Sequence, residues 1–211
     1  MSSLTKMVND ELEEKLFFIP NFIVDTKMFS MDDCNFIRDY LSNNYTLTGG
    51  REYSNYDNIP QQRIADVVLI NQAPTELVWM WERFNNLIAH YNDRHFNFDL
   101  YGFNYLQYAR YGIGGKHEFH MDLPLSGKKV NSNLMENLRK LTVVLLLGEP
   151  GVDFEGGEFQ INHFSEQYPW STNLKKGNVL IFPSFLLHRV SPIISGVRES
   201  ITIWPVGPKF K

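Results

Sequence analysis

The segment YGIGGKHEFHMD, residues 111–122, decides how the second half of this chain folds. Its glycines favour a tight corner, because glycine reaches backbone conformations that other residues avoid. The run after that corner ends in His120 and Asp122, which lie two positions apart. If the run is a β-strand, both side chains point to the same side of the sheet, since strand side chains alternate with a period of two. The segment therefore predicts a turn and a strand that presents an imidazole beside a carboxylate.

A second segment, GNVLIFPSFLLHRVSPIISGVRESITIW (residues 177–204), supplies a third group of the same kind. It predicts a strand that ends in Phe-Pro-Ser, a short turn that delivers His188, and a second turn before the last strand. Two imidazoles and one carboxylate can occupy one face of a metal ion and leave three positions open, as in non-heme Fe(II) oxygenases. A His-x-Asp tripeptide alone is common by chance. Together, His120, Asp122 and His188 predict a metal site.

Arg198 follows His188 on the last strand and adds a cation to the expected site. Its planar guanidinium can hold a carboxylate through two parallel hydrogen bonds. Ser200 and Thr202 share its strand parity and would point to the same side. A buried arginine without an anion is costly, so an inward Arg198 implies a carboxylate ligand. The alternative is an arginine at the rim that pairs with Glu199 or Glu158.

Size and composition limit the classes of protein to which the chain can belong. With 211 residues and 43% hydrophobic content, the chain can form one well-buried domain. A net charge of −4 without a basic stripe argues against a nucleic-acid partner. Cys34 is the only cysteine, which excludes intramolecular disulfides and favours a reducing compartment. We see no signal peptide and no apolar run long enough to cross a membrane, so we expect a soluble, cytoplasmic protein.

The first half of the chain has the pattern of helices. Ser30 resembles a helix cap and is followed by acidic residues, which predicts a helix over residues 31–44. A second helix is expected to open at Pro74. Each helix has an apolar stripe, which we interpret as core: Phe36, Ile37, Tyr40 and Leu41 in the first helix, and Leu77, Trp81, Phe84, Ile88 and Tyr91 in the second.

Two polar segments are expected to be loops beside the site. Residues 48–63 are rich in Gly, Asn and Tyr without an apolar period, which indicates an exposed loop or a flap over the site. Residues 123–137 follow the His-x-Asp motif and are a second candidate lid. His117 lies three residues before His120, so regular alternation would point it away from the metal, towards the entrance or behind the ligands.

The second half of the chain is expected to be a β-sandwich or barrel. Several short apolar or alternating runs are separated by glycine, proline and polar residues, without intervening helical patterns. The runs cover residues 102–111, 141–147, 157–161, 178–182 and 200–204.

The motifs YGIGGKHEFHMD, FEGGEF (residues 154–159) and GNVLIFPSFLLHRVSPIISGVRESITIW resemble the Fe(II)/2-oxoglutarate dioxygenases of the prolyl 4-hydroxylase type. The resemblance covers roughly residues 99–206. It implies an α+β fold with a mainly β core, a double-stranded β-helix (jelly roll) with supporting N-terminal helices. We expect one domain over residues 1–211, with helical support over about 1–98 and a jelly-roll catalytic core over about 99–206.

The resemblance also implies residue roles. His120, Asp122 and His188 match the iron ligands, and Arg198 matches the basic residue that binds the distal carboxylate of 2-oxoglutarate. Further co-substrate contacts are implied for Tyr111, Ser200 and Thr202. Where some relatives have a co-substrate-binding tyrosine, this chain has Leu146. The hydrogen bond that this tyrosine gives to the co-substrate would have to come from Tyr111, Thr142 or Thr202.

The implied activity is hydroxylation of an unactivated C–H bond with release of succinate and CO2. The cofactors would be Fe(II), 2-oxoglutarate as co-substrate, and ascorbate. The expected substrate is a prolyl or other amino-acid side chain in a peptide or protein. Oxidation of a free small molecule is the alternative, and a non-catalytic jelly-roll binding module is a third reading. The sequence names neither the substrate nor the oligomeric state.

Overall fold

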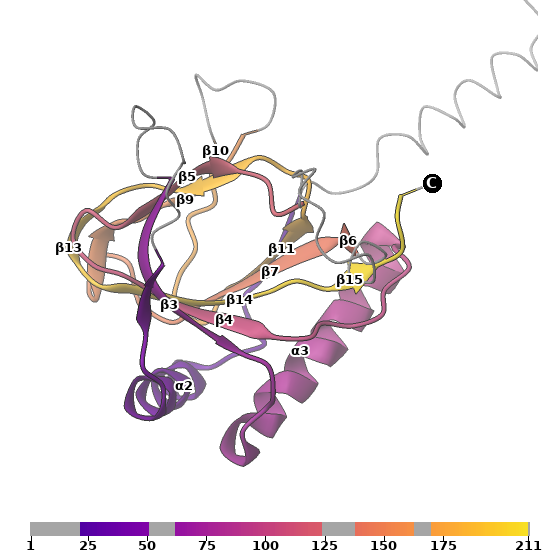
Figure 1. The fold of residues 1–211 in the computed structure, drawn as a ribbon, viewed down its shortest axis with the longest axis horizontal. Helices are drawn as coiled ribbons and strands as arrows, with labels where there is room; N and C mark the ends of the chain where they lie inside the picture. Colours follow the sequence, from indigo (N-terminus) through magenta and orange to yellow (C-terminus); the bar gives the residue numbers. More distant parts are fainter. Residues whose placement is uncertain (1–21, 51–61, 124–137, 163–169, 211) are drawn as a thin grey trace, which may run out of the picture.

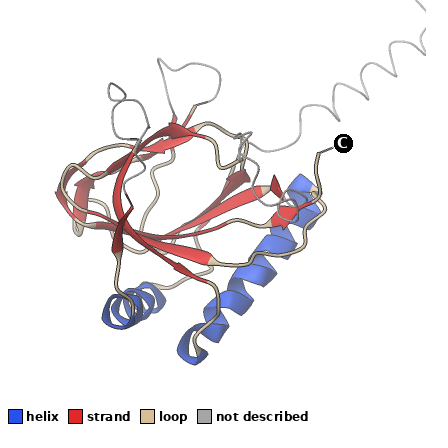
Figure 2. Ribbon diagram, viewed as in Figure 1, coloured by secondary structure: helices blue, strands red, loops and turns tan. Residues whose placement is uncertain are grey.

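A curled antiparallel sheet forms the body of the protein, with helices packed on one outer face (Figures 1 and 2). The computed structural model describes residues 22–50, 62–123, 138–162 and 170–210. Its helices are α2 (Met31–Asn44), η1 (Thr75–Leu77), α3 (Val78–Tyr91) and the π-helical turn η2 (Asn92–Phe96).

From residue 106 onward, all helices and strands that the structure describes are strands. They are β1 (Ile23–Asp25), β2 (Thr48–Gly50), β3 (Arg63–Ile70), β4 (Leu106–Tyr111), β5 (Lys116–His120), β6 (Leu138–Arg139), β7 (Leu141–Leu146), β8 (Phe154–Gly156), β9 (Phe159–Ile161), β10 (Trp170–Ser171), β11 (Val179–Pro183), β12 (His188–Val190), β13 (Ile193–Gly196), β14 (Arg198–Ile203) and β15 (Val206–Gly207). All five strand runs expected after residue 99 are present, with slightly different bounds.

Strand β3 joins the two layers of the curled sheet. The strand order is β1-β11-β7-β14-β4-β3-β5-β12-β9-β10, with β2 beside β3. The second part of β3 pairs with β4, whereas Arg63 and Ile64 pair with β5. The sheet thereby folds over on itself at β3, and the result is the jelly roll expected from the sequence (Figure 1).

The strands β1, β2 and β3 correct one expectation about the first half of the chain. No strand was expected before residue 99, and residues 48–63 were expected to be a loop. Residues 48–50 instead form β2, and residue 63 opens β3. The segment Arg63–Ile70 is rich in β-branched residues, and its neighbours β4 and β5 satisfy its backbone hydrogen bonds. Residues 51–61 lie outside the described part of the chain, as does most of the second candidate lid.

Two apolar clusters lie on opposite faces of the larger layer. The outer cluster joins the helices to the sheet and contains Ile37, Leu41, Phe84, Leu87, Tyr108, Leu145 and Ile201 among others. The inner cluster contains Ala65, Ala109, Tyr111, Val144, Leu146, Phe159 and Phe182 among others. Strand β7 contributes to both, which explains why its sequence is continuously apolar.

Both expected helices are present, and the buried faces differ slightly from the expected stripes. In α2, Cys34, Ile37 and Leu41 are buried, whereas Phe36 is 48% exposed. In α3, the buried side chains are Met80, Phe84, Leu87 and Ile88, whereas the expected Trp81 and Tyr91 are only partly buried. Among the described residues, no helix combines the length and the apolar character that crossing a bilayer requires.

Helix α2 begins with a capping box at Ser30. The Ser30 hydroxyl accepts a hydrogen bond from the Asp33 backbone N–H at 3.1 Å. The Asp33 carboxylate in turn accepts from the Ser30 backbone N–H at 2.9 Å. These bonds satisfy two donors that a helix start otherwise leaves free.

We expect Ser30→Ala to lower the free energy of unfolding by about 1 kcal/mol, because it removes the cap acceptor. Urea titration followed by circular dichroism measures the change. The matched control is Ser42→Ala at the exposed end of the same helix, where the hydroxyl only donates to the Asp39 carbonyl. Equal losses in the two variants would contradict the capping role.

Candidate metal centre

The pairing of β5 with β12 brings the two distant histidines together. His188 lies directly opposite His120 in this antiparallel pair. The corner before β5 is tight, as the glycines predict: the Gly115 N–H donates to the Gly112 carbonyl at 2.7 Å. The ligand atoms of His120, Asp122 and His188 all lie within 4.8 Å of one another.

The carboxylate of Asp122 lies between the two imidazoles. One oxygen, Oδ1, is 3.6 Å from His120 Nε2, and the other, Oδ2, is 3.5 Å from His188 Nε2. The two rings are 4.2 Å apart between centroids and tilted by 54°. Two Nε2 atoms and one carboxylate oxygen thus converge on one point, which is the donor set of a facial triad.

Backbone carbonyls fix the tautomer of both histidines. His120 Nδ1 is 2.8 Å from the Glu118 carbonyl oxygen, and His188 Nδ1 is 2.8 Å from the Leu186 carbonyl oxygen. A carbonyl oxygen only accepts, so Nδ1 carries the hydrogen in each ring. The Nε2 lone pairs are therefore free and directed to the point where the three groups converge.

Asp122 is held by its neighbours on both its backbone and its side chain. The Thr142 hydroxyl donates to Oδ2 at 2.7 Å, and the Asp122 N–H donates to the Ser184 carbonyl at 2.9 Å. Burial alone would raise the pKa of Asp122, but the adjacent His120 and His188 outweigh it and hold this pKa well below its usual range. The carboxylate is therefore ionised, as a metal ligand must be.

Burial keeps His188 in its neutral form. The residue is 3% exposed, and its ring packs against the rings of Phe159 and Phe182. Desolvation lowers the pKa of His188 to about 4, although the charge of Asp122 opposes the shift. The neutral imidazole is the form that binds a metal.

His117 lies against the ring of His120, which agrees with a place behind the ligands, but the regular alternation expected for β5 is wrong. Its ring stacks on the His120 ring at 3.5 Å between centroids. From His120 to His117 strand β5 advances three residues, while β12 advances only from His188 to Val190. The extra residue in β5 is a β-bulge, which reverses the alternation and turns His117 to the face of His120. Burial lowers the pKa of His117 to about 2, so this ring is neutral.

Arg198 points into the curled sheet at the start of β14, as strand parity predicts. It is 2% exposed, and its Nη1 donates to the Ser200 hydroxyl at 3.1 Å. Its Nε donates to the Gly157 carbonyl at 3.1 Å. Burial lowers the pKa of Arg198, although the group stays charged because a guanidinium titrates far above neutrality.

The surroundings of Arg198 leave it without an anion among the described residues. The rim alternative is not observed, because Glu199 faces the other side of the sheet and pairs with Arg110 at 3.2 Å. Tyr111 lies directly opposite Arg198 in the β4–β14 pair, and the guanidinium carbon is 5.6 Å from its ring centroid. The cation therefore fits a carboxylate that comes from a ligand.

The remaining candidate residues are placed around Arg198 in different ways. Thr202 lies further along β14, half-buried and opposite Gln107 and Val144. Leu146 is buried opposite Ser200, so no hydroxyl stands at that position. Among the suggested replacements, Thr142 already donates to Asp122.

Sequence reasoning missed the role of Thr142 as a partner of Asp122, and it missed Arg63 with its partner Gln107. Thr142 orients Asp122, and its signal was a single hydroxyl within the apolar run LTVVLLL. Arg63 is 7% exposed and donates from Nη1 to Gln107 Oε1 at 3.2 Å. The sequence signal for Arg63 was its position at the start of a segment rich in β-branched residues, and that segment was not assigned to a strand.

Comparison with known protein families agrees with this geometry. Residues 106–205 match the family model of the 2OG-Fe(II) oxygenase superfamily. The chain is 36% identical over 78 residues to a PKHD-type hydroxylase of Idiomarina loihiensis, which is 37% of this chain and 35% of that protein. It is 33% identical over 98 residues to a PKHD-type hydroxylase of Psychrobacter sp., which is 46% of this chain and 36% of that protein. The match thus spans about a third of the length of these curated relatives.

Solved structures share the fold over nearly the whole chain. A prolyl-4-hydroxylase of Pseudomonas putida superposes with a TM-score of 0.67 at 15% identity, over 95% of this chain and 97% of that chain. A prolyl hydroxylase of Trichoplax adhaerens, in complex with a peptide fragment of the hypoxia inducible factor oxygen degradation domain, gives 0.66 at 18% identity, over 97% and 93%. Residues 106–205 are thus similar in sequence to the 2OG-Fe(II) oxygenase superfamily, and the chain shares its fold with these solved prolyl hydroxylases.

Proposed function

We propose that this chain is an Fe(II)- and 2-oxoglutarate-dependent dioxygenase that hydroxylates an unactivated C–H bond and releases succinate and CO2. The observation that carries the proposal is the convergence of two Nε2 atoms and one carboxylate oxygen within 4.8 Å. A structural metal site would usually have four protein ligands, whereas this group offers three. The three positions left open suit a metal that must also bind a co-substrate and dioxygen.

The residues around the centre fit this chemistry. His120, Asp122 and His188 would hold Fe(II), which supplies the positions at which a keto acid and dioxygen react. Arg198 would hold the distal carboxylate of 2-oxoglutarate. Its partner Ser200 is two residues away, and Tyr111 lies beside the guanidinium. Thr202 is proposed as a further hydroxyl in the same pocket. The retained Asp122 favours hydroxylation over halogenation, because a halide would need the position of the carboxylate.

A prolyl or other amino-acid side chain in a peptide or protein is the proposed substrate. Support comes from the PKHD-type hydroxylases and from structural neighbours that are prolyl hydroxylases, one of them bound to a peptide. The cytoplasmic location and a role for ascorbate stay predictions. The single cysteine, Cys34, is free and buried, which agrees with a reducing compartment.

The first test is turnover of 2-oxoglutarate. Protein incubated with Fe(II), 2-oxoglutarate and ascorbate should release succinate, and candidate proline peptides should increase the rate. His120→Ala should reduce release to the level without iron, because the triad loses one ligand. The control His95→Ala removes an exposed histidine on the helical side and should leave the rate unchanged. Equal succinate release in wild type and His120→Ala would refute the enzyme.

We expect Thr142→Val to weaken metal binding by about 10- to 100-fold, because Asp122 loses the hydroxyl that orients it. Equilibrium titration with Fe(II) under anaerobic conditions, or with Zn(II), measures the affinity. The control is Thr48→Val, since Thr48 is exposed on β2 and its hydroxyl only donates to the Val67 carbonyl. An unchanged affinity in Thr142→Val would contradict the positioning role of this hydroxyl.

Gly157→Ala should weaken 2-oxoglutarate binding about tenfold. A Cβ at Gly157 would lie 2.4 Å from Ile193 Cδ1 and 3.0 Å from Arg198 Cδ, so the arginine must shift. Calorimetric titration of the Zn(II)-loaded protein measures the affinity.

Gly151→Ala is the matched control for this variant. Gly151 has a similar positive φ of +78°, but a Cβ there meets nothing within 4 Å. Both variants should lose stability through backbone strain, and only Gly157→Ala should lose affinity for 2-oxoglutarate. Equal affinities would show that Arg198 is not held by this turn.

A further inference from the structure

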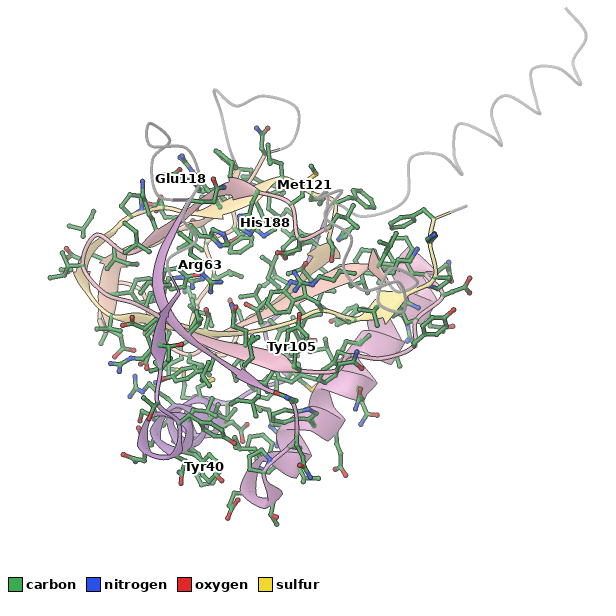
Figure 3. The ribbon with its side chains drawn as sticks, viewed as in Figure 1. Tyr40, Arg63, Tyr105, Glu118, Met121 and His188 are labelled. Atoms are coloured by element: carbon green, nitrogen blue, oxygen red, sulfur yellow. The ribbon has the colours of Figure 1, made fainter. Side chains whose placement is uncertain are left out.

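Arg63 is a second buried arginine inside the curled sheet, and the proposed function leaves it without a role. It opens β3 and is 7% exposed. Figure 3 shows Arg63 and His188 on the inner side of the sheet, with the strands curled around them. Arginine is rarely buried without a partner, so its contacts need an explanation.

The hydrogen bonds of Arg63 are incomplete. Nη1 donates to Gln107 Oε1 at 3.2 Å, but Nε and Nη2 are shielded from water and have no hydrogen-bond partner among the described residues. No described carboxylate lies within ion-pair distance of it. Arg198, in contrast, donates from both Nε and Nη1.

This arrangement is unfavourable in free energy if the protein alone supplies the partners of Arg63. A guanidinium loses its hydration on burial, and only an anion with well-placed acceptors compensates for that loss. Gln107 is neutral and supplies one acceptor. With Oε1 engaged, the amide hydrogens of Gln107 become further donors beside the guanidinium. The local chemistry therefore suits an oxyanion that accepts from both residues.

Arg63 is close to the metal ligands through its neighbour on β5. It pairs with His117 across the β3–β5 ladder, and the His117 ring stacks on the His120 ring. Arg198 instead approaches from β14 and is fixed by the turn at Gly157. The two arginines thus come from different strands and have different partners.

The balance of charges inside the sheet indicates which ligand Arg63 binds. Arg63, Arg198 and Asp122 are buried there, whereas the buried Lys140 and Glu199 interact elsewhere, with Phe210 and Arg110. With Fe(II) and 2-oxoglutarate bound, two guanidinium charges and the two charges of the metal would face one protein carboxylate and the two carboxylates of the co-substrate. One positive charge is left over once metal and co-substrate are bound.

We infer that Arg63, with Gln107, binds a carboxylate of the substrate that is oxidised. The inference rests on the proposed function and narrows its substrate class to carboxylate-bearing molecules. The carboxylate belongs either to an acidic residue near the oxidised side chain in a peptide or to a free amino acid. In both cases a bidentate contact would fix the substrate at a set distance from the metal ligands.

The decisive measurement is a nuclear magnetic resonance titration of the arginine Nε–H groups in protein loaded with Zn(II) and 2-oxoglutarate. Comparison with Arg63→Lys and Arg198→Lys assigns the two signals. Acetate should shift the Arg63 signal in a saturable way, whereas neutral acetamide should not. The Arg198 signal should not respond to acetate, because 2-oxoglutarate already occupies it.

Calorimetric titration with acetate provides an independent measurement, because it can be applied to variants that lack the Arg63 signal. Arg63→Gln should weaken acetate binding about tenfold, since a hydrogen bond to a charged group is lost. Arg63→Lys should weaken it less. The control Arg83→Gln removes a cation from the outer, helical side, where Arg83 pairs with Asp33, and should change nothing. Affinity for 2-oxoglutarate should stay the same in Arg63→Gln.

Two results would overturn the inference. One is an Arg63 signal that ignores acetate. The other is an Arg63 signal that shifts when 2-oxoglutarate is added to the Zn(II) protein and is then insensitive to acetate, which would assign Arg63 to the co-substrate. Neither result depends on turnover. Failure of the acetate titration can therefore be distinguished from failure of the proposed function, which would appear as absence of succinate.

Two pairs of probes separate the sources of the carboxylate. Free L-proline is compared with L-prolinamide, and a blocked peptide containing Asp-Pro with its Asn-Pro counterpart. Tighter binding of L-proline than of L-prolinamide identifies a free amino acid as the source of the carboxylate. Tighter binding of the Asp-Pro peptide than of the Asn-Pro peptide identifies a peptide substrate.

Discussion

The backbone hydrogen bonds between β5 and β12 place His120 opposite His188, and the rest of the site is arranged around that pair. Asp122 follows β5 directly, so the same ladder sets its position. The carbonyls of Glu118 and Leu186 then fix the two imidazoles. The strand pairing is made by the backbone, and each imidazole is held by a main-chain carbonyl oxygen of the protein. These contacts fix the positions of the donor atoms, and a fixed donor set lowers the reorganisation that binding requires.

The interior of the sheet combines apolar walls with a few charges. Phe159 and Phe182 surround His188, and Leu146 lies opposite Ser200. In such surroundings an ion pair is stronger than in water, and an unpaired charge costs more. Arg198 and Arg63 both lack an anionic partner among the described residues. We interpret them as two places where ligands, rather than the protein, supply the negative charge.

The sequence was sufficient to predict that His120, Asp122 and His188 come together and that Arg198 points inward. A strand has a strict period of two, so the spacing of His120 and Asp122 and the parity of Arg198 and Ser200 translate directly into geometry. The jelly roll followed from the short strands and the family resemblance. The capped helix over residues 31–44 followed from Ser30.

The errors have a common physical cause, which is pairing between segments that are distant in the sequence. Strand parity failed at His117 because a bulge in β5 depends on the pairing with β12, which the sequence of β5 does not contain. Strand β3 was missed because its role as the link between layers is a tertiary property. Arg63 was missed with it, and the function of Thr142 is visible only once Asp122 is beside it. In each of these cases, contacts between distant segments determine the structure, and the local sequence pattern does not contain them.

The position of β14 between β4 and β7 also governs how the chain folds while it is synthesised. Strand β4 can pair with β3 early, but its other edge stays open until residues 198–203 have emerged. Strand β1 likewise waits for β11. An unpaired strand edge is a template for association with other chains. The open edge of β4 must therefore be protected while most of the second half of the chain is made, and closure of the sheet is a late, non-local event that slows folding.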